Sequence, residues 1–394
     1  MPDALSKIGE SFLHGMNLRA THVRSVPEIC LEALKERPIR WLRIHETPTR
    51  RLDEKADNGL TYLDGIEELC KAGYNLIVPI DVGSVENVGR IPLGSLDKFV
   101  QESYDYSKEA AYKLHSMAQS HGRKIIFGVE NEIDTKEWLL QSSPGVEWRG
   151  ETTTWFTLSI DAEKKYKRLN NILAGIRDAA PEALTMTNVE ADDLDDYLVQ
   201  MRKYLDESAG ILRKNGLIAE SKELGDYLED WKIEMARVRD KLDVDLVGID
   251  NYPNYILKWP VLGGDIGPKA NDASRISERQ VINCEFGYST YRSTAEKLEA
   301  FLLGKPSARE MQQEFFRIAL ASIEASSSKG TFPWVTFTEP SGSNNPPQEG
   351  WFGLYKLKDK EVAYAEPSFK LYCDWLNSGR LTRTMGQVRR DGKP

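Results

Sequence analysis

The sequence lacks several of the patterns that assign a protein to a common class. Only four cysteines occur among its 394 residues, and none forms a CxxC pair or lies beside a histidine. We therefore expect free thiols and no metal site built on cysteine. Basic residues are not in excess either, because the formal net charge is −9. A nucleic-acid partner is accordingly not favoured.

Long apolar runs and glycine-rich phosphate loops are absent as well. No stretch approaches the roughly 20 apolar residues that span a membrane, and the first residues have no apolar signal core. We expect a cytoplasmic protein with no membrane partner; a secreted one would require that a signal peptide has been removed. The first apolar segment contains HGMNLR, which is neither a GxGxxG nor a Walker pattern. This weakens any nucleotide-dependent function.

What the sequence does contain is an alternation of short apolar runs and amphipathic segments. The runs predict eight strands at 12–18, 39–44, 74–80, 125–129, 183–188, 244–250, 280–287 and 331–338. Helices are predicted at 25–37, 60–72, 94–120, 161–180 and 306–328. This alternation predicts an α/β protein, with a single-domain (β/α)8 TIM barrel over residues 1–394 as the leading architecture. A doubly wound open sheet remains an alternative, because alternation alone does not show closure.

Two segments depart from this period. Residues 191–243 are highly charged and helical in pattern, so we expect a long helical insertion between strands 5 and 6, with Asn215-Gly216 at a turn. Such a segment is most often a solvated helical face, and a homo-oligomer could also use it as a contact. The tail from about 350 to 394 should supply a last hairpin and helix.

Polar side chains occupy the C-terminal ends of the predicted strands, where α/β barrels place catalytic groups. Two of them are carboxylates, since Glu132 closes the fourth run and Glu285 closes the seventh. The others are Asn17, Arg43, His45, Asp81, Asn131, Asn188, Tyr252 and Trp334. Amides and arginine address sugar hydroxyls, aromatic rings stack on pyranose faces, and glycoside cleavage needs two carboxylic groups. Nothing fixes the spacing of a metal-binding set, so no metal site is predicted.

These residues, in this order, resemble the retaining glycoside hydrolases of clan A. The strand-four hallmark of that superfamily, an Asn-Glu pair, is matched by Asn131-Glu132, and its strand-seven Glu by Glu285-Phe286-Gly287. Further matches are Arg43, Tyr252 in VGIDNYP, Trp334 and the tail motif Gly350-Trp351-Phe352-Gly353-Leu354. The resemblance covers almost the whole chain. It implies a (β/α)8 barrel that works on carbohydrate without a cofactor.

Carried over to this chain, the resemblance implies a role for each matched carboxylate. Glu132 would be the general acid/base and Glu285 the nucleophile, with about 5–5.5 Å between their carboxyl groups. Arg43 and the hydroxyl of Tyr252 would keep Glu285 ionised for attack.

The resemblance also implies how the sugar is held. Asn131 would bind the hydroxyl next to the reacting carbon, and Trp334 would form the floor of that subsite. The remaining substrate contacts predicted at the strand ends are Asn17, Arg43, His45, Asp81, Tyr252 and Asn188.

Several of these residues also have purely structural explanations. Glu130 departs from the superfamily pattern, and an ion pair with a cation from a neighbouring strand is favoured over a catalytic role. Arg43 could form a structural pair with Glu46. Cys284 alternates with Glu285 along a strand, so its thiol should face the helices. Sugar stacking and loop packing are equally open for the tryptophans that follow strand four, Trp138, Trp148 and Trp155.

The predicted function is a retaining β-glycoside hydrolase acting on β-linked oligosaccharides or small glycosides. Long segments after strands four, six and eight would close one end of the cleft, which favours exo-action. An endo-acting β-glycanase is the alternative within the clan. From other classes, a catalytically silent carbohydrate-binding barrel and a metal-dependent sugar isomerase remain open.

Overall fold

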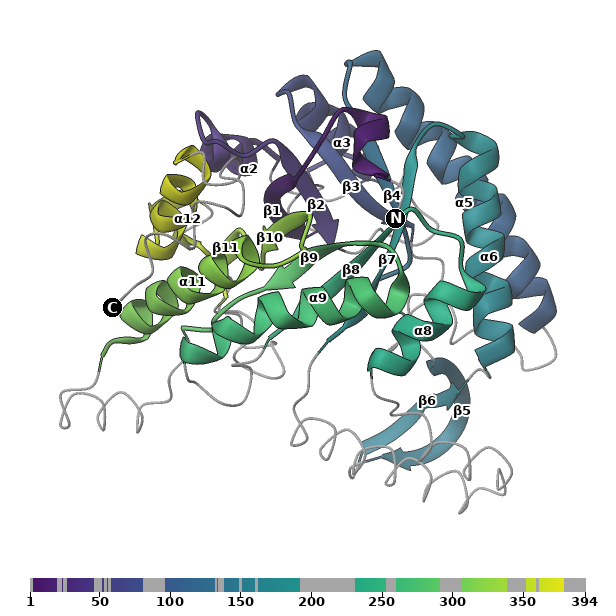
Figure 1. The fold of residues 1–394 in the computed structure, drawn as a ribbon. Helices are drawn as coiled ribbons and strands as arrows, with labels where there is room; N and C mark the ends of the chain where they lie inside the picture. Colours follow the sequence, from purple (N-terminus) through teal and green to yellow (C-terminus); the bar gives the residue numbers. More distant parts are fainter. Residues whose placement is uncertain are drawn as a thin grey trace.

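The chain folds into a closed barrel of eight parallel strands in this computed structural model (Figure 1). The structure describes residues 3–19, 23, 27–45, 52, 55, 58–80, 96–131, 133, 138–148, 151–159, 162–191, 231–252, 260–290, 306–338, 352–358 and 361–378. The barrel strands, in spatial order, are β1 (Leu13–Arg19), β10 (Gly330–Pro333), β9 (Gln280–Phe286), β8 (Leu246–Asn251), β7 (Leu184–Glu190), β4 (Ile125–Val129), β3 (Asn75–Ile80) and β2 (Trp41–His45). Leu13 pairs with Gly330, so the first strand meets the last. This closure excludes the open sheet and confirms the (β/α)8 barrel.

Both faces of the barrel strands are buried, which explains why the sequence shows continuous apolar runs. All five residues of β4 are buried. Ile126 packs in the barrel interior, whereas Phe127 and Val129 pack in the layer between the strands and the helices. The interior is filled by side chains from every barrel strand, namely Leu13, Trp41, Ile77, Ile126, Leu184, Met186, Leu246, Ile282, Cys284 and Phe332.

Helices surround the barrel in Figure 1 and follow most of the strands in the chain. The described α-helices are α2 (Pro27–Leu34), α3 (Tyr62–Lys71), α5 (Leu96–Ser120), α6 (Ala162–Ala179), α8 (Trp231–Lys241), α9 (Ile266–Ser277), α11 (Ala308–Glu324) and α12 (Pro367–Asn377). Thr61 and Asp64 form a reciprocal capping box at the start of α3, and Ser307 and Glu310 do so at α11. Within the described residues, none of the helices is long and apolar enough to cross a membrane.

The eighth predicted strand, 331–338, is corrected by the structure. Barrel strand β10 ends at Pro333, and the chain then turns at the barrel rim, where the backbone nitrogen of Thr336 donates to the carbonyl of Asn17 at 3.1 Å. Phe337 and Thr338 form a separate short strand, β11. It pairs with β12 (Tyr355–Lys358), which forms a hairpin with β13 (Glu361–Ala365) ahead of α12. The expected tail hairpin and helix are therefore confirmed.

Three further segments differ from the sequence prediction or lie outside the described residues. The segment after β4 contains an antiparallel hairpin, β5 (Trp138–Trp148) and β6 (Glu151–Ser159), which was not predicted and lies below the barrel strands in Figure 1. Helix α9 was not predicted either. Residues 192–230 of the expected insertion lie outside the described residues, so the insertion stays a prediction.

Helix α12 covers the seam where the first and last barrel strands meet. The hydroxyl of Tyr372 lies 2.9 Å from the carbonyl oxygen of Gly15 on β1 and 3.1 Å from that of Thr331 on β10. The side chain is fully buried. Burial raises the pKa of this hydroxyl well above its ordinary value, so it stays protonated and available as a donor.

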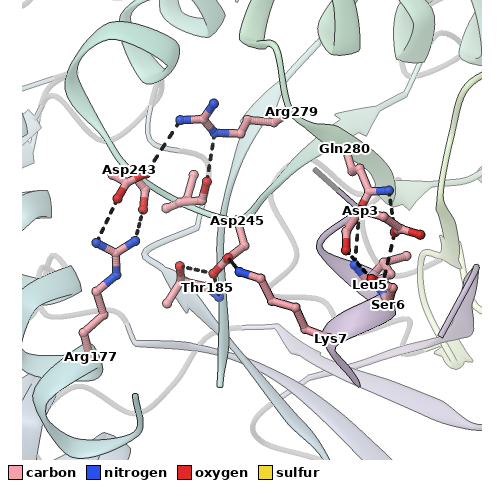
Figure 2. A network of polar contacts seen from close by, with 11 residues as sticks. Asp3, Leu5, Ser6, Lys7, Arg177, Thr185, Asp243, Asp245, Arg279 and Gln280 are labelled. Atoms are coloured by element: carbon pink, nitrogen blue, oxygen red, sulfur yellow. Dashed lines mark hydrogen bonds and ion pairs between the residues drawn. The ribbon is translucent and has the colours of Figure 1, made fainter. Parts of the chain in front are cut away.

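Polar side chains join the N-terminal ends of the barrel strands to the first residues of the chain (Figure 2). Lys7, in the 3₁₀ helix Leu5–Ile8, donates to Asp245 at 2.9 Å, just before β8. The other carboxylate oxygen of Asp245 accepts from the backbone nitrogen and the hydroxyl of Thr185, both at 3.0 Å. Burial alone would raise the pKa of Asp245, but the Lys7 and Thr185 donors outweigh it and lower the pKa.

A second aspartate at this end, Asp243, is more exposed (Figure 2). Arg177 of α6 pairs with it at 3.1 Å, and Arg279, just before β9, lies 3.7 Å from its other oxygen. Arg279 also donates to the carbonyl of Val244 at 3.0 Å. The Asp243 side chain is 78% exposed, so each pair contributes little stability, but together they tie α6, β8 and β9 at their ends.

Candidate active site

Arg43 lies at the centre of a buried polar cluster at the C-terminal ends of the barrel strands. It is on β2 and only 1% of its surface is exposed. Its guanidinium donates to Asn17 on β1 at 2.9 Å, to Asn131 two residues after β4, and to Glu285 on β9. The buried ion-pair partner of Arg43 is thus Glu285. The alternative partner, Glu46, lies outside the described residues.

A β-bulge at Cys284 turns Glu285 toward Arg43. Ile249 and Asp250 are adjacent on β8, but their partners on β9 are Asn283 and Glu285, so Cys284 is an extra residue. The Cys284 side chain packs in the barrel interior, and Glu285 still reaches the cluster from the next position. The prediction that Cys284 faces the helices is wrong, because it assumed strict alternation. Burial raises the pKa of this thiol well above its ordinary value.

Two residues accommodate the bulge. Gly248 on β8 lies opposite the inward thiol, and a Cβ at this position would lie 2.3 Å from the Cys284 sulfur. The side-chain NH2 of Asn17 donates to the carbonyl of Cys284 at 2.7 Å and to that of Phe332 at 2.8 Å. Because its amide oxygen accepts from Arg43, Asn17 links the bulge to the guanidinium. Direct contact of Asn17 with substrate stays a prediction.

The second oxygen of Glu285 is bound by a phenol. The hydroxyl of Tyr252, directly after β8, donates to it at 2.5 Å. The Tyr252 ring packs edge-on against Phe352, with 5.4 Å between ring centroids, in a buried cluster that also contains Trp334. Arg19 places its guanidinium carbon 5.5 Å from the centre of the Trp334 ring. The structure therefore places Tyr252 against Glu285 and in the same buried cluster as Trp334.

Asp250 on β8 is a member of this cluster that the sequence analysis did not single out. It is fully buried, and its carboxylate accepts from the side-chain NH2 of Asn188 on β7. The same NH2 donates to the amide oxygen of Asn131 at 3.0 Å. A signal was present in the sequence, because Asp250 closes an apolar run just as Glu285 does.

The guanidinium of Arg43 lies within electrostatic reach of both carboxylates. Burial alone would lower the pKa of Arg43, but the neighbouring Glu285, Cys284 and Asp250 outweigh it and raise the pKa. The side chains of Arg43 and Glu285 are each only 2% exposed, so water screens their attraction weakly. Both carboxyl oxygens of Glu285 are hydrogen-bonded, one to the guanidinium of Arg43 and one to the hydroxyl of Tyr252.

The side chain of Glu130 forms a buried ion pair. It has a left-handed backbone conformation (φ 57°), which ends β4 irregularly. Its buried carboxylate pairs with Arg168, whose side chain is 4% exposed. The expected ion pair is therefore present, but the cation comes from helix α6 and not from a neighbouring strand.

For three of the predicted site residues, the structure describes no side chain. Glu132 and Asp81 lie outside the described residues, and of His45 only the backbone is described, paired with Arg19. The residues on either side of Glu132 are held: Asn131 by its side-chain contacts, and Ile133 by a backbone bond to the carbonyl of Asn188 at 3.1 Å. In the part of the chain that is described, no group of three His, Cys, Asp or Glu side chains is placed to hold a metal ion.

Comparison with solved structures gives the same architecture. A GH53 catalytic domain from Ignisphaera aggregans matches 92% of this chain and 95% of its own, with 14% identity and a TM-score of 0.53. A family 1 β-glucosidase from Thermotoga maritima matches 93% and 98%, with 13% identity and a TM-score of 0.53. The fold is that of (β/α)8 glycoside hydrolases.

A third solved structure is matched over only part of its own length. An exo-β-1,4-mannosidase from Opitutaceae bacterium strain TAV5 matches 94% of this chain and 60% of its own, with 13% identity and a TM-score of 0.54. At these identities the likeness to the glycoside hydrolases concerns the fold. No protein-family model and no curated protein sequence matches the chain. The resemblance to (β/α)8 glycoside hydrolases is thus confirmed at the level of the fold.

Proposed function

We propose that the protein is a glycoside hydrolase that cleaves β-glycosides with retention of configuration. The observation that carries this proposal is the setting of Glu285. Its carboxylate lies at the C-terminal end of the barrel, with one oxygen bound by Arg43 and the other by the hydroxyl of Tyr252. A carboxylate held ionised and oriented in this way suits a nucleophile.

The proposed reaction proceeds in two displacements. In the first, Glu132 gives its proton to the leaving oxygen while an oxygen of Glu285 bonds to the anomeric carbon and the glycosidic bond breaks. In the second, water attacks that carbon, Glu132 takes a proton from the water, and the bond to Glu285 breaks. Both steps pass through an oxocarbenium-like transition state, in which Asn131 would bind the neighbouring hydroxyl more strongly.

We further propose exo-action on oligosaccharides or small glycosides. The hairpin of β5 and β6 follows the strand that delivers Glu132 and would wall one side of the cleft. The relatives named as a β-glucosidase and as an exo-β-1,4-mannosidase lend support to a β-linked substrate. Trp334 beside Tyr252 would supply the apolar floor for the sugar ring.

A screen of aryl β-glycosides, followed by trapping with a 2-fluoro sugar, tests the proposal. We expect turnover with at least one glycoside and a covalent label on Glu285, located by peptide mass spectrometry. A product of inverted configuration would contradict retention, and a label on another residue would contradict the role of Glu285. Glu132→Gln and Glu285→Gln should both lose turnover, and azide should restore it to Glu285→Gly.

The same screen separates the alternatives. Cleavage of internal linkages in a long chain would indicate endo-action. Sugar binding without any turnover would indicate a silent barrel, and loss of a sugar-isomerising activity with a chelator would indicate the metal-dependent class.

A further inference from the structure

The cluster around Arg43 contains three asparagine side chains whose orientation is set by two ions. A side-chain amide has a donor end and an acceptor end, and only its partners decide which way it points. Guanidinium groups only donate and carboxylates only accept. Arg43 therefore requires the amide oxygens of Asn17 and Asn131 to face it, as they do.

Asp250 imposes the opposite orientation on Asn188. Its carboxylate accepts from the NH2 of Asn188, which directs the second hydrogen of that NH2 at the amide oxygen of Asn131, 3.0 Å away. Arg43 lies within electrostatic reach of Asp250, whose negative charge contributes to the raised pKa of Arg43. All members of this relay are buried, with Asp250 and Asn188 at 0% and 2% exposure, so water does not compete for the bonds.

We propose that Asp250 is a positioning residue, which through Asn188 adds a second hold, beside that of Arg43, on the Asn131 amide and so on the end of it that faces the sugar. With its oxygen held by Arg43 and Asn188, Asn131 can only offer its NH2 to the hydroxyl next to the reacting carbon. This inference rests on the proposed function, because it assigns a role to that contact. Asp250 itself touches no reacting atom in the reaction described above.

The physical effect falls mainly on the transition state. A hydrogen bond from Asn131 to that hydroxyl strengthens as positive charge develops on the ring, so an amide held by Arg43 alone, and therefore less firmly oriented, would lose part of that gain. The loss should appear in kcat more than in KM. It should also disappear when the substrate has no hydroxyl at that position.

The test compares the same substitution, Asp to Asn, at the two ends of strand β8. Asp250→Asn removes the acceptor-only partner at the C-terminal end of β8, and Asp245→Asn makes the same change beside its N-terminal end. For each variant, kcat and KM are measured with an aryl glycoside and with its 2-deoxy analogue. Asn188→Leu, similar in size, is the second variant, because it removes the NH2 that carries the relay.

The measured quantity is the ratio of kcat/KM for the aryl glycoside to kcat/KM for its 2-deoxy analogue, called here the preference for the hydroxylated substrate. We expect Asp250→Asn to reduce this preference about tenfold, and Asn188→Leu to reduce it at least as much. Asp245→Asn should leave that preference unchanged. A merely structural role for Asp250 would slow the turnover of both substrates equally and leave the preference unchanged. That outcome would overturn the inference. An active wild-type enzyme with an unchanged ratio contradicts this inference alone. A wild-type chain with no turnover contradicts the proposed function as well.

Discussion

The two ends of strand β8 place an aspartate in opposite surroundings. Asp245, just before the strand, has a partly exposed side chain and binds a lysine and a threonine. Asp250, near the other end of the strand, is fully buried and binds an asparagine. The carboxylate of Asp245 accepts hydrogen bonds from Lys7 and Thr185 and is partly open to solvent. That of Asp250 depends on a chain of oriented amides, so its surroundings tolerate change less.

The ion pairs at the two ends differ in the same way. The side chains of Lys7 and Asp245 are 59% and 19% exposed, whereas those of Arg43 and Glu285 are each 2% exposed. An exposed pair adds little to stability, and a buried pair carries a desolvation cost that its attraction only partly offsets. The desolvation cost of buried charge thus falls at the C-terminal end of the barrel, where the proposed function would use the charged groups.

The largest effect should come from changing Arg43 to lysine. The charge remains, but an ammonium cannot hold Glu285, Asn131 and Asn17 at once, so we expect kcat/KM to fall at least about a hundredfold. Steady-state kinetics with an aryl glycoside measure it. Arg279→Lys is the matched control at the other end and should leave kcat/KM unchanged. Equal kcat/KM values for Arg43→Lys and Arg279→Lys would contradict the expected difference in function between the two ends of the barrel.

A smaller effect, on stability alone, is expected for Asp245→Asn. The new amide cannot accept from Lys7 and from Thr185 in the same geometry, so the free energy of unfolding should fall by about 1–3 kcal/mol. Urea denaturation followed by circular dichroism measures the change. Turnover should stay at the wild-type level. An unaltered urea midpoint would show that these contacts do not support the fold.

The pH dependence of Asp245 sharpens the same comparison. Its pKa is lowered in the folded state, so its contribution is present above its unfolded pKa of about 4 and is lost as pH falls through the folded value. The stability difference between the wild type and Asp245→Asn should therefore shrink in acid. Urea midpoints of both proteins at neutral pH and near pH 3 test this. A difference that grows in acid would reverse the assigned sign.

The smallest effect is expected for Lys7→Met. Because this lysine is 59% exposed, its pair with Asp245 should contribute only about 0.2–1 kcal/mol, and less in high salt. Urea midpoints at low and high ionic strength provide the measurement. A loss that does not respond to salt would contradict a contribution from the attraction between the two charges.

The barrel strands were predictable because their signal is local. A strand such as β4, buried on both faces, must be apolar along its whole length, and the sequence shows this directly. Strand β10 was misjudged because the turn after Pro333 depends on a backbone bond from Thr336 to Asn17, which is remote in the sequence. The hairpin of β5 and β6 escaped prediction because its segment lacks regular alternation.

The site was predictable in its residue types but not in its connections. The carboxylate, amides and phenol around Arg43 were expected from their places at strand ends. Neither the bulge at Cys284 nor the contact of Asp250 with Asn188 could be derived, because both depend on packing between different strands. Gly248 is visible in the sequence, but the need for it appears only when the thiol of Cys284 lies opposite it.

The hydroxyl of Tyr372 bridges two strands that lie at opposite ends of the chain. It reaches Gly15 across 357 positions of sequence, and Thr331 across 41. During synthesis the barrel cannot gain this closing contact until residue 372 has left the ribosome. Folding should therefore be limited by a contact between early and late residues, and a nascent chain halted before α12 would leave the edges of β1 and β10 without this bridge.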